Sequence, residues 1–338
     1  MVLFFAIGAK RRAYKQLGLP KKQLHVFVCQ YIKGDTEMYN TCLELAVKGF
    51  ILGDAAGVPY ENKKRGTFNC NEFRNSRWND SHFILPLGTW SDDTSLMLCV
   101  LEALNHEKIE KRWVRNSAKF MLFGFYTNHF FKVPYDVGNT CRKGILYSLI
   151  GKTNPKASQI SSNGNGGIMR MLPLAFVKIN TTEDLLQLIS VFNSNSHGHR
   201  ISNMGCLIYI SILRKLIQGN IDIPTLLQEI NDELKEYETV EYETILSGKI
   251  LNLSADSIKS TGYVVDTLEA AIWALANSKN YEETVFNAIN LGGDTDTISA
   301  IAGSMAALKY KDFNKKWWSK IKRRKFVDGL IIESKINI

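Results

Sequence analysis

The stretch LELAVKGFILG, at residues 43–53, is decisive for the fold class. Its apolar side chains recur at i, i+3, i+4, i+7 and i+8, which places them on one face of an α-helix that we expect to end at Gly53. The same spacing marks helices at 201–212 and 264–275, and weaker forms predict further helices at 94–105, 111–125, 182–192, 224–235, 281–290 and 296–309. Alternating strand patterns are scarce, and the best candidate is HVFVC at 25–29. The sequence therefore predicts an all-α fold.

Composition and charge narrow the class of protein. The chain has 338 residues, of which 45% are hydrophobic and 22% charged, values that exclude disordered and collagen-like chains. The net charge of +9 is concentrated at the ends, with +5 in residues 1–40, +6 in residues 311–338 and −2 between them. We expect a basic N-terminal appendage (1–40), a catalytic domain (41–310) and a basic C-terminal helix or tail (311–338). The lysines around Trp317 and Trp318 indicate either an amphipathic helix with packed tryptophans and solvated lysines or a nucleic-acid-binding patch.

The cysteines and apolar runs bear on location. Six cysteines occur without a CxxC pair, which is typical of reduced, mostly buried thiols in the cytoplasm or another reducing intracellular compartment. No apolar run approaches the roughly 18 residues that span a bilayer. The apolar start, 2–9, precedes its positive cluster, whereas a signal peptide carries the charge first. We therefore expect no secretion signal and no membrane contact.

Two acidic clusters stand at predicted helix starts. Ser91-Asp92-Asp93-Thr94 opens an apolar helix, where a serine and two acidic residues either cap the helix or supply hard oxygen ligands for a divalent cation. Gly292-Gly293-Asp294-Thr295-Asp296-Thr297 has a second aspartate and a glycine pair that a cap does not need, so it favours metal binding. The clusters are about two hundred residues apart, and they form one site only if the fold brings them together.

Three further features could carry chemistry. The glycine-rich segment from Asn163 to Met169 either cradles a phosphate with backbone N–H groups or forms a flexible turn, and it matches no standard nucleotide motif. Glu61, which follows Pro59 in an expected extended segment, is either a surface carboxylate or a general base. His197 and His199 are either metal ligands, loop donors near an anion, or packing residues.

Together these motifs resemble the ADP-ribosylglycohydrolase family, in particular its branch similar to the dinitrogenase reductase-activating glycohydrolase. The motifs that carry the resemblance occur in order along residues 41–310: GDAAGVPYE (53–61), GTWSDDTSLML (88–98), PYDVGNTCRKGI (134–145), GNGGIMRMLPLA (164–175), SHGHR (196–200), GYVVDTLEAAIWA (262–274) and LGGDTDTISAIAGSMAA (291–307). The resemblance implies a single orthogonal helical bundle that acts as a monomer and holds two divalent cations, Mg²⁺ or Mn²⁺, in a cleft.

The resemblance also implies roles for individual residues. The expected metal ligands are Ser91, where the family usually has threonine, and Asp92, Asp93, Asp294, Asp296 and Thr297. The expected substrate-binding residues are Asn163, Gly164, Asn165, Gly166, Gly167, Ile168 and Met169, which would hold the diphosphate, and His197. Glu61 and Asp136 are the expected catalytic residues, with Glu61 acting on water and Asp136 lying near the ribose.

The implied activity is hydrolysis of the glycosidic bond between ADP-ribose and a modified protein side chain or related conjugate. The basic ends could recruit an acidic partner such as nucleic acid or poly(ADP-ribose). One alternative is a non-catalytic ADP-ribose-binding or structural member of the family. Another is a haloacid-dehalogenase-like phosphatase, since Asp294-x-Asp296 resembles its nucleophile motif. That motif should end a buried strand, whereas here glycines precede it after a helical stretch.

Overall fold

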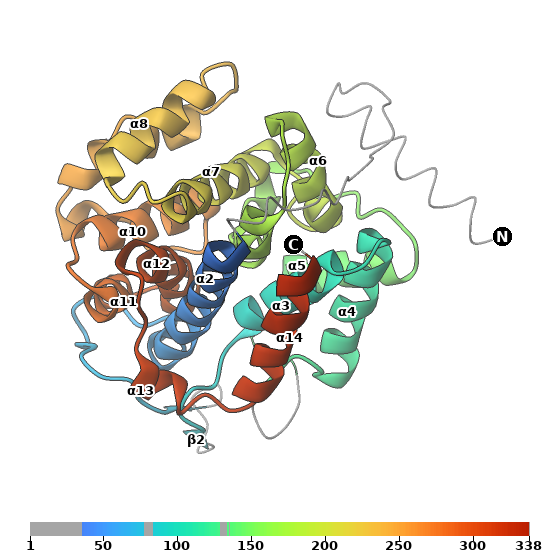
Figure 1. Cartoon of the computed structure of the whole chain (residues 1–338), viewed down its shortest axis with the longest axis horizontal. Coiled ribbons are helices and arrows are strands. Elements are labelled where there is room, and N and C mark those ends of the chain that lie inside the picture. Colours follow the sequence, from blue (N-terminus) through green and yellow to red (C-terminus); the bar gives the residue numbers. More distant parts are fainter. Residues whose placement is uncertain (1–35, 78–83, 129–133, 135, 338) are drawn as a thin grey trace.

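The computed structural model describes residues 36–77, 84–128, 134 and 136–337, and these fold mainly into helices (Figure 1). The α-helices are α2 (Thr36–Gly57), α3 (Asp92–Leu104), α4 (Ile109–Phe123), α5 (Asn139–Leu149), α6 (Thr182–Asn193), α7 (Arg200–Ile217), α8 (Ile223–Glu233), α9 (Glu243–Leu246), α10 (Val264–Ala276), α11 (Tyr281–Asn290), α12 (Thr295–Tyr310), α13 (Lys315–Trp318) and α14 (Arg324–Asn337). Every helix that the sequence predicted is present, and the all-α class is confirmed.

Three details differ from the sequence predictions or lie beyond the structure. The first helix does not stop at Gly53 but continues to Gly57, because its last turn is made of small residues that pack closely against α12. Helix α5 was not predicted. The candidate strand at 25–29 lies outside the described residues, as does most of the expected appendage at 1–40. The strands in the described part are β1 (Ser76–Arg77) and β2 (Ile84–Leu85), an antiparallel pair with Ser76 opposite Leu85.

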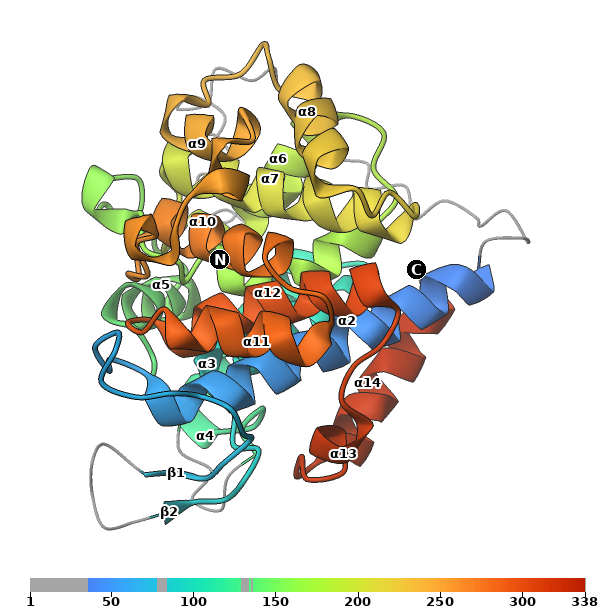
Figure 2. The same cartoon turned by 90° about the vertical axis from the view of Figure 1, so that its left-hand side faces the viewer.

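Helix α12 forms the centre of the bundle, where it contacts α2, α7, α10 and α11. Figure 2 shows α2, α12 and α11 lying side by side. All side chains of α12 from Thr295 to Leu308 are buried, which explains why this segment lacks a polar face. A helix that is apolar or small on every side can be stable only when neighbours surround it. The central position of α12 fixes the place of the acidic residues at its N-terminus.

A stripe of glycines lets α2 approach α12 closely. Gly49, Gly53 and Gly57 recur every four residues, so they lie on one face of α2. A Cβ at Gly53 would lie 2.0 Å from the carbonyl oxygen of Ser299, and one at Gly57 would lie 2.4 Å from that of Thr295. The close approach allows the hydroxyls of Ser299 and Thr295 to donate to the carbonyls of Gly53 and Gly57, at 2.7 and 2.9 Å. These contacts fix the end of α2 against the start of α12.

The C-terminal segment packs into the same hydrophobic core as the rest of the bundle. Trp318, Ile321 and Val327 are buried in it, and α14 lies against α2 and α3. Trp317 stacks on Phe73 with ring centroids 5.2 Å apart. The interpretation that these tryptophans pack is therefore confirmed, although only the short α13 and the separate α14 are helical there. The basic side chains from Lys315 to Lys325 are exposed.

Two other sequence expectations can be compared with the described residues. The thiols of Cys42, Cys70, Cys99, Cys141 and Cys206 are all buried and none forms a disulfide. Among the helices of the described part, none combines the length and the apolar character that crossing a membrane requires.

Candidate metal centre and substrate loop

The acidic site begins with Asp54 in the last turn of α2. Its carboxylate is completely buried and accepts hydrogen bonds from the backbone N–H groups of Ser91, at 2.9 and 3.2 Å, and Thr94, at 3.0 Å. These N–H groups belong to the start of α3, whose first-turn donors have no partner within the helix. Asp54 thus caps α3 from a different helix and holds the two helix ends together.

Asp54 was not among the site residues predicted from the sequence. The signal that could have found it is an ionisable residue in the small, apolar end of a helix, with no basic residue nearby to pair its charge. A buried carboxylate must be hydrogen-bonded or paired, so such a residue marks either a cap or a binding site.

The first acidic cluster forms the start of α3. Ser91 is the N-cap residue, and its hydroxyl oxygen accepts from the backbone N–H of Asp93 at 3.2 Å and donates to Asp93 Oδ2 at 2.8 Å. Asp92 and Asp93 are both buried. The capping interpretation of this cluster is confirmed, and it does not exclude metal binding, since Asp93 Oδ1 is buried without a hydrogen-bond partner.

The second acidic cluster forms the start of α12. The hydroxyl of Thr297 donates to Asp93 Oδ2 at 3.2 Å, which joins the two clusters directly. Asp296 is buried at the same place. Asp294 is half-buried, and its Oδ2 accepts from the side-chain amide of Asn165 at 3.0 Å. The expected convergence of two segments two hundred residues apart is therefore confirmed.

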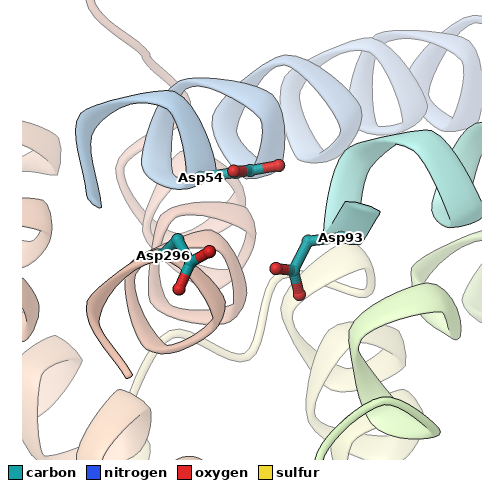
Figure 3. Close-up of side chains that lie close together, drawn as sticks. All are labelled: Asp54, Asp93 and Asp296. Atoms are coloured by element: carbon teal, nitrogen blue, oxygen red, sulfur yellow. The ribbon is translucent and has the colours of Figure 1, made fainter. Parts of the chain in front are cut away.

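Two groups of carboxylates meet here and share Asp296. Oxygens of Asp54, Asp93 and Asp296 lie within 4.8 Å of one another, and so do oxygens of Glu61, Asp136 and Asp296. Figure 3 shows that the first three come from the end of α2 and the starts of α3 and α12. The expected ligands Asp92 and Asp294 belong to neither group. Both are close enough to Asp93 for their charges to raise its pKa.

The electrostatics of this cluster are those of carboxylates that lack a counter-charge. Burial raises the pKa values of Asp93 and Asp296 well above the usual range, and neighbouring carboxylates raise them further. Burial also raises the pKa of Asp54 to about 6. The pKa of Glu61 is raised to about 9, first by burial and then by Asp136. A divalent cation among these groups would lower all four pKa values, because it favours the charged forms.

The donor set fits a hard cation. It consists only of carboxylate and hydroxyl oxygens, which suit Mg²⁺ and Mn²⁺ rather than softer metals. The unpartnered oxygen of Asp93 is the kind of buried atom that a bound ion would satisfy. Neither His197 nor His199 joins a group of potential metal ligands within the described residues, so their interpretation as ligands receives no support.

Glu61 and Asp136 lie at the outer side of this cluster. Glu61 is half-buried and follows the 3-10 helix Val58–Tyr60. The prediction of an extended segment before Glu61 is therefore wrong. Pro59 accounts for the difference, since its fixed φ suits the start of a helical turn. Asp136 has the left-handed backbone conformation, with φ 55°, which is uncommon outside glycine.

The glycine-rich segment lies beside the acidic cluster. Asn165 donates from its backbone N–H to Gly262 at 2.9 Å, and its side-chain amide reaches Asp294 and Thr267, each at 3.0 Å. The segment ends in the 3-10 helix Ile168–Arg170 and not in an α-helix. Asn163 accepts from the backbone N–H of Ser202 at 3.1 Å, which fixes the segment to α7.

His197 packs beneath this segment. A Cβ at Gly166 would lie 2.8 Å from Cε1 of His197 and 2.7 Å from Sγ of Cys141, so only glycine fits there. His197 is buried, and burial together with the nearby Arg170 lowers its pKa well below the usual range. Its imidazole is therefore neutral near pH 7. His199 is half-buried and caps α7, accepting from Ile201 N–H at 3.3 Å.

The family follows from comparison of the whole chain with known proteins. The sequence model described as ADP-ribosylglycohydrolase matches residues 45–335, and the chain belongs to this family. It is 28% identical over 306 residues to the ADP-ribosylarginine hydrolase Tri1 of Serratia proteamaculans, a match that covers 84% of this chain and 76% of that protein. It is also 28% identical over 280 residues to the ADP-ribosyl-[dinitrogen reductase] glycohydrolase of Rhodospirillum rubrum, covering 82% and 88%.

The fold leads to the same family. A solved structure titled ADP-ribosylglycohydrolase-related protein complex superposes with a TM-score of 0.70 at 26% identity, covering 89% of this chain and 99% of that chain. The resemblance drawn from the motifs is confirmed. The phosphatase alternative is excluded, because Asp294 follows α11 and two glycines with left-handed φ, where that motif requires the end of a buried strand.

Proposed function

We propose that this protein is a metal-dependent hydrolase that removes ADP-ribose from a modified protein side chain. The observation that carries the proposal is the meeting of Asp54, Asp93 and Asp296, with Glu61 and Asp136 adjoining, in one acidic site beside a glycine-rich segment. Asp93 and Asp296, with Ser91, Asp92, Asp294 and Thr297 around them, would hold two divalent cations, Mg²⁺ or Mn²⁺. Bound cations would supply charge stabilisation and orient the ribose hydroxyls.

The residues of the chain account for the rest of the reaction. Cleavage at the anomeric carbon of ribose passes through an oxocarbenium-like state, which requires a positioned water and a carboxylate to accept its proton. Glu61 takes one proton from the water as the water oxygen bonds to the anomeric carbon. The C–N or C–O bond to the side chain breaks, and the proton held by Glu61 passes to the leaving atom. Asp136 lies against the ribose. The segment Asn163–Met169 holds the diphosphate, and His197 contacts the ADP-ribose. The neutral imidazole of His197 can donate a hydrogen bond there without bringing a charge.

The relatives support arginine-linked ADP-ribose as the first substrate to test. Two ADP-ribosylarginine hydrolases, from Serratia proteamaculans and from Pseudomonas putida, match at 28% and 29% identity, and the Rhodospirillum rubrum enzyme acts on ADP-ribosyl-dinitrogen reductase. Serine-linked, nucleic-acid-linked and O-acetyl-ADP-ribose complete the panel, since the proposed chemistry serves N- and O-glycosyl bonds equally.

The test is release of ADP-ribose from this panel in Mg²⁺, in Mn²⁺ and in EDTA. We expect release with either cation and none in EDTA. Glu61→Gln should lower kcat by about two orders of magnitude while ADP-ribose binding is retained, the usual scale for loss of a general base. Glu110→Gln, an exposed change on α4, is the control and should have wild-type activity. Binding of ADP-ribose without release from any linkage would favour the non-catalytic alternative.

A further inference from the structure

Arg65 lies four residues after Glu61, and its side chain reaches the segments that precede the second acidic cluster. Its Nε donates to the carbonyl of Leu291 at 2.8 Å, and Nη2 donates to that of Ile258 at 2.5 Å. Nη1 donates to the carbonyl of Ala255. One guanidinium thus joins the chain after Glu61 to two segments that are far away in the sequence, residues 255–258 and Leu291. Within the described part of the chain, no ion pair involves it, so its hydrogen bonds to carbonyls define its role.

The turn beneath Arg65 is the one that delivers Asp294 and Asp296. Gly292 and Gly293 both have left-handed φ, 71° and 72°, and backbone hydrogen bonds join this turn to the chain after Glu61. Asn62 N–H donates to Gly293 at 2.8 Å, and Gly293 N–H donates to Lys63 at 2.9 Å. On the other side, Asp294 N–H donates to Ser260 at 3.0 Å. The turn is therefore held between residues 62–65 and residues 258–260.

The guanidinium suits this position better than other side chains would. A Cβ at Gly292 would lie 2.6 Å from the backbone nitrogen of Arg65, so the turn packs directly against the main chain of this arginine. Arginine carries five donors in a rigid plane and can bond several carbonyls at once, whereas a lysine ammonium is a compact group on a flexible stem. Loss of these bonds would leave the turn held to Asn62, Lys63 and Ser260 by backbone hydrogen bonds alone.

We propose that Arg65 is a positioning residue that sets the separation between Glu61 and the Asp294–Asp296 segment. The inference rests on the proposed function, since Glu61 is the catalytic carboxylate and Asp296 a metal ligand in it. Rates of enzymatic reactions are sensitive to such separations, and a displacement of about 1 Å can cost about 100-fold in rate. Among the described residues, the Arg65 side chain hydrogen-bonds only to backbone carbonyls, so its proposed action on the carboxylates is indirect.

The experiment compares Arg65→Ala and Arg65→Lys with Arg214→Ala. Arg214 is a matched control, because its guanidinium also donates to a backbone carbonyl, that of Val177 at 2.9 Å, but away from the acidic site. We expect Arg65→Ala to lower kcat about 30-fold or more with KM changed less than threefold, and Arg65→Lys to restore only part of the loss. Methylguanidinium added at millimolar concentration should raise kcat of Arg65→Ala at least threefold, which a general loss of folding would not allow.

A second readout does not depend on activity. Hydrogen exchange of the amides at 292–294 should be at least tenfold faster in Arg65→Ala than in wild type, and unchanged in Arg214→Ala. A kcat of Arg65→Ala within threefold of Arg214→Ala, or unchanged exchange at this turn, would overturn the inference. A wild-type protein that releases no ADP-ribose from any linkage would instead overturn the proposed function, and exchange would still decide whether Arg65 holds the turn.

Discussion

Substitution of Gly53 by alanine tests the contact that brings the two halves of the site together. The new Cβ would lie 2.0 Å from the carbonyl oxygen of Ser299, whereas ordinary contacts begin near 3.4 Å. Helices α2 and α12 would have to separate by about 1.4 Å at this point. The obstacle is backbone of a fully buried helix, so a change of rotamer cannot relieve it.

The expected loss of stability follows from three contributions. Overpacking of this kind costs about 1–3 kcal/mol. Weakening the hydrogen bond from Ser299 to the Gly53 carbonyl, now 2.7 Å long, adds about 1 kcal/mol. Alanine returns about 1 kcal/mol through its higher helix propensity. We therefore expect a net loss of about 1–3 kcal/mol in the free energy of unfolding. Binding of Mn²⁺ should also weaken, because Asp54 is the next residue along α2.

Urea denaturation measures the first effect and titration calorimetry with Mn²⁺ the second. With a slope of about 2–3 kcal/mol per molar urea, the midpoint should fall by about 0.3–1.5 M. Gly329→Ala is the control, since this glycine lies in α14 and its Cβ would meet open space, so the change should stabilise the protein slightly. If Gly53→Ala were as stable as Gly329→Ala and bound Mn²⁺ as tightly as wild type, the close approach of α2 and α12 would not position the site.

Three further predictions concern the site. The double variant Asp93→Asn with Asp296→Asn should bind Mn²⁺ at least 100-fold more weakly, as measured by calorimetry. Asp312→Asn on the surface is the control and should leave Mn²⁺ binding unchanged. Normal Mn²⁺ uptake in the double variant would refute the ligand assignment. Burial and neighbouring carboxylates raise the folded-state pKa of Asp93. In EDTA, the stability of wild type relative to Asp93→Asn should therefore be greatest below about pH 4 and fall as the pH rises through the folded pKa, which thermal melts would measure. A stability difference that increases with pH would contradict the repulsion between these carboxylates. Gly166→Ala should weaken ADP-ribose binding about tenfold because its Cβ meets Cys141 and His197 at 2.7 and 2.8 Å. Gly138→Ala, whose Cβ would have no atom of the described residues within 4 Å, should bind as wild type does.

The helices could be predicted from the sequence because each has a local cause. The stripe in 43–53 and the caps before α3 and α6 are readable from neighbouring residues alone. The end of α2 was misplaced because it depends on a distant partner. Gly53 is a common stop signal, but here it serves the approach to α12, which no local pattern records.

The site was only partly predictable for a similar reason. The clusters at 91–94 and 294–297 could be found as unusual runs of acidic residues, and their convergence was inferred from chemistry and from the family resemblance. Asp54 was missed because a single aspartate in a helix carries no pattern of its own, and its importance comes from hydrogen bonds to Ser91 and Thr94 that form across the fold. Arg65 was missed because its partners are backbone carbonyls, which any residue type can offer.

The hydrogen bonds of the cluster support the proposal of a metal centre over that of a helix cap alone. The carboxylate of Asp54 is satisfied by α3, whose N-terminal dipole carries about half a positive charge. The N-terminus of α12 contributes a similar fraction. Together the two dipoles supply about one unit of positive charge for three fully buried carboxylates and the adjoining pair of Glu61 and Asp136.

Capping therefore accounts for Asp54 but leaves the charges of Asp93 and Asp296 uncompensated, with Asp93 Oδ1 unpartnered. Buried charges are retained only when they are paired or coordinated, and the described residues place no basic side chain in salt-bridge contact with these two. The excess of negative charge over what α3 and α12 can stabilise is thus the strongest physical reason to expect divalent cations at this place.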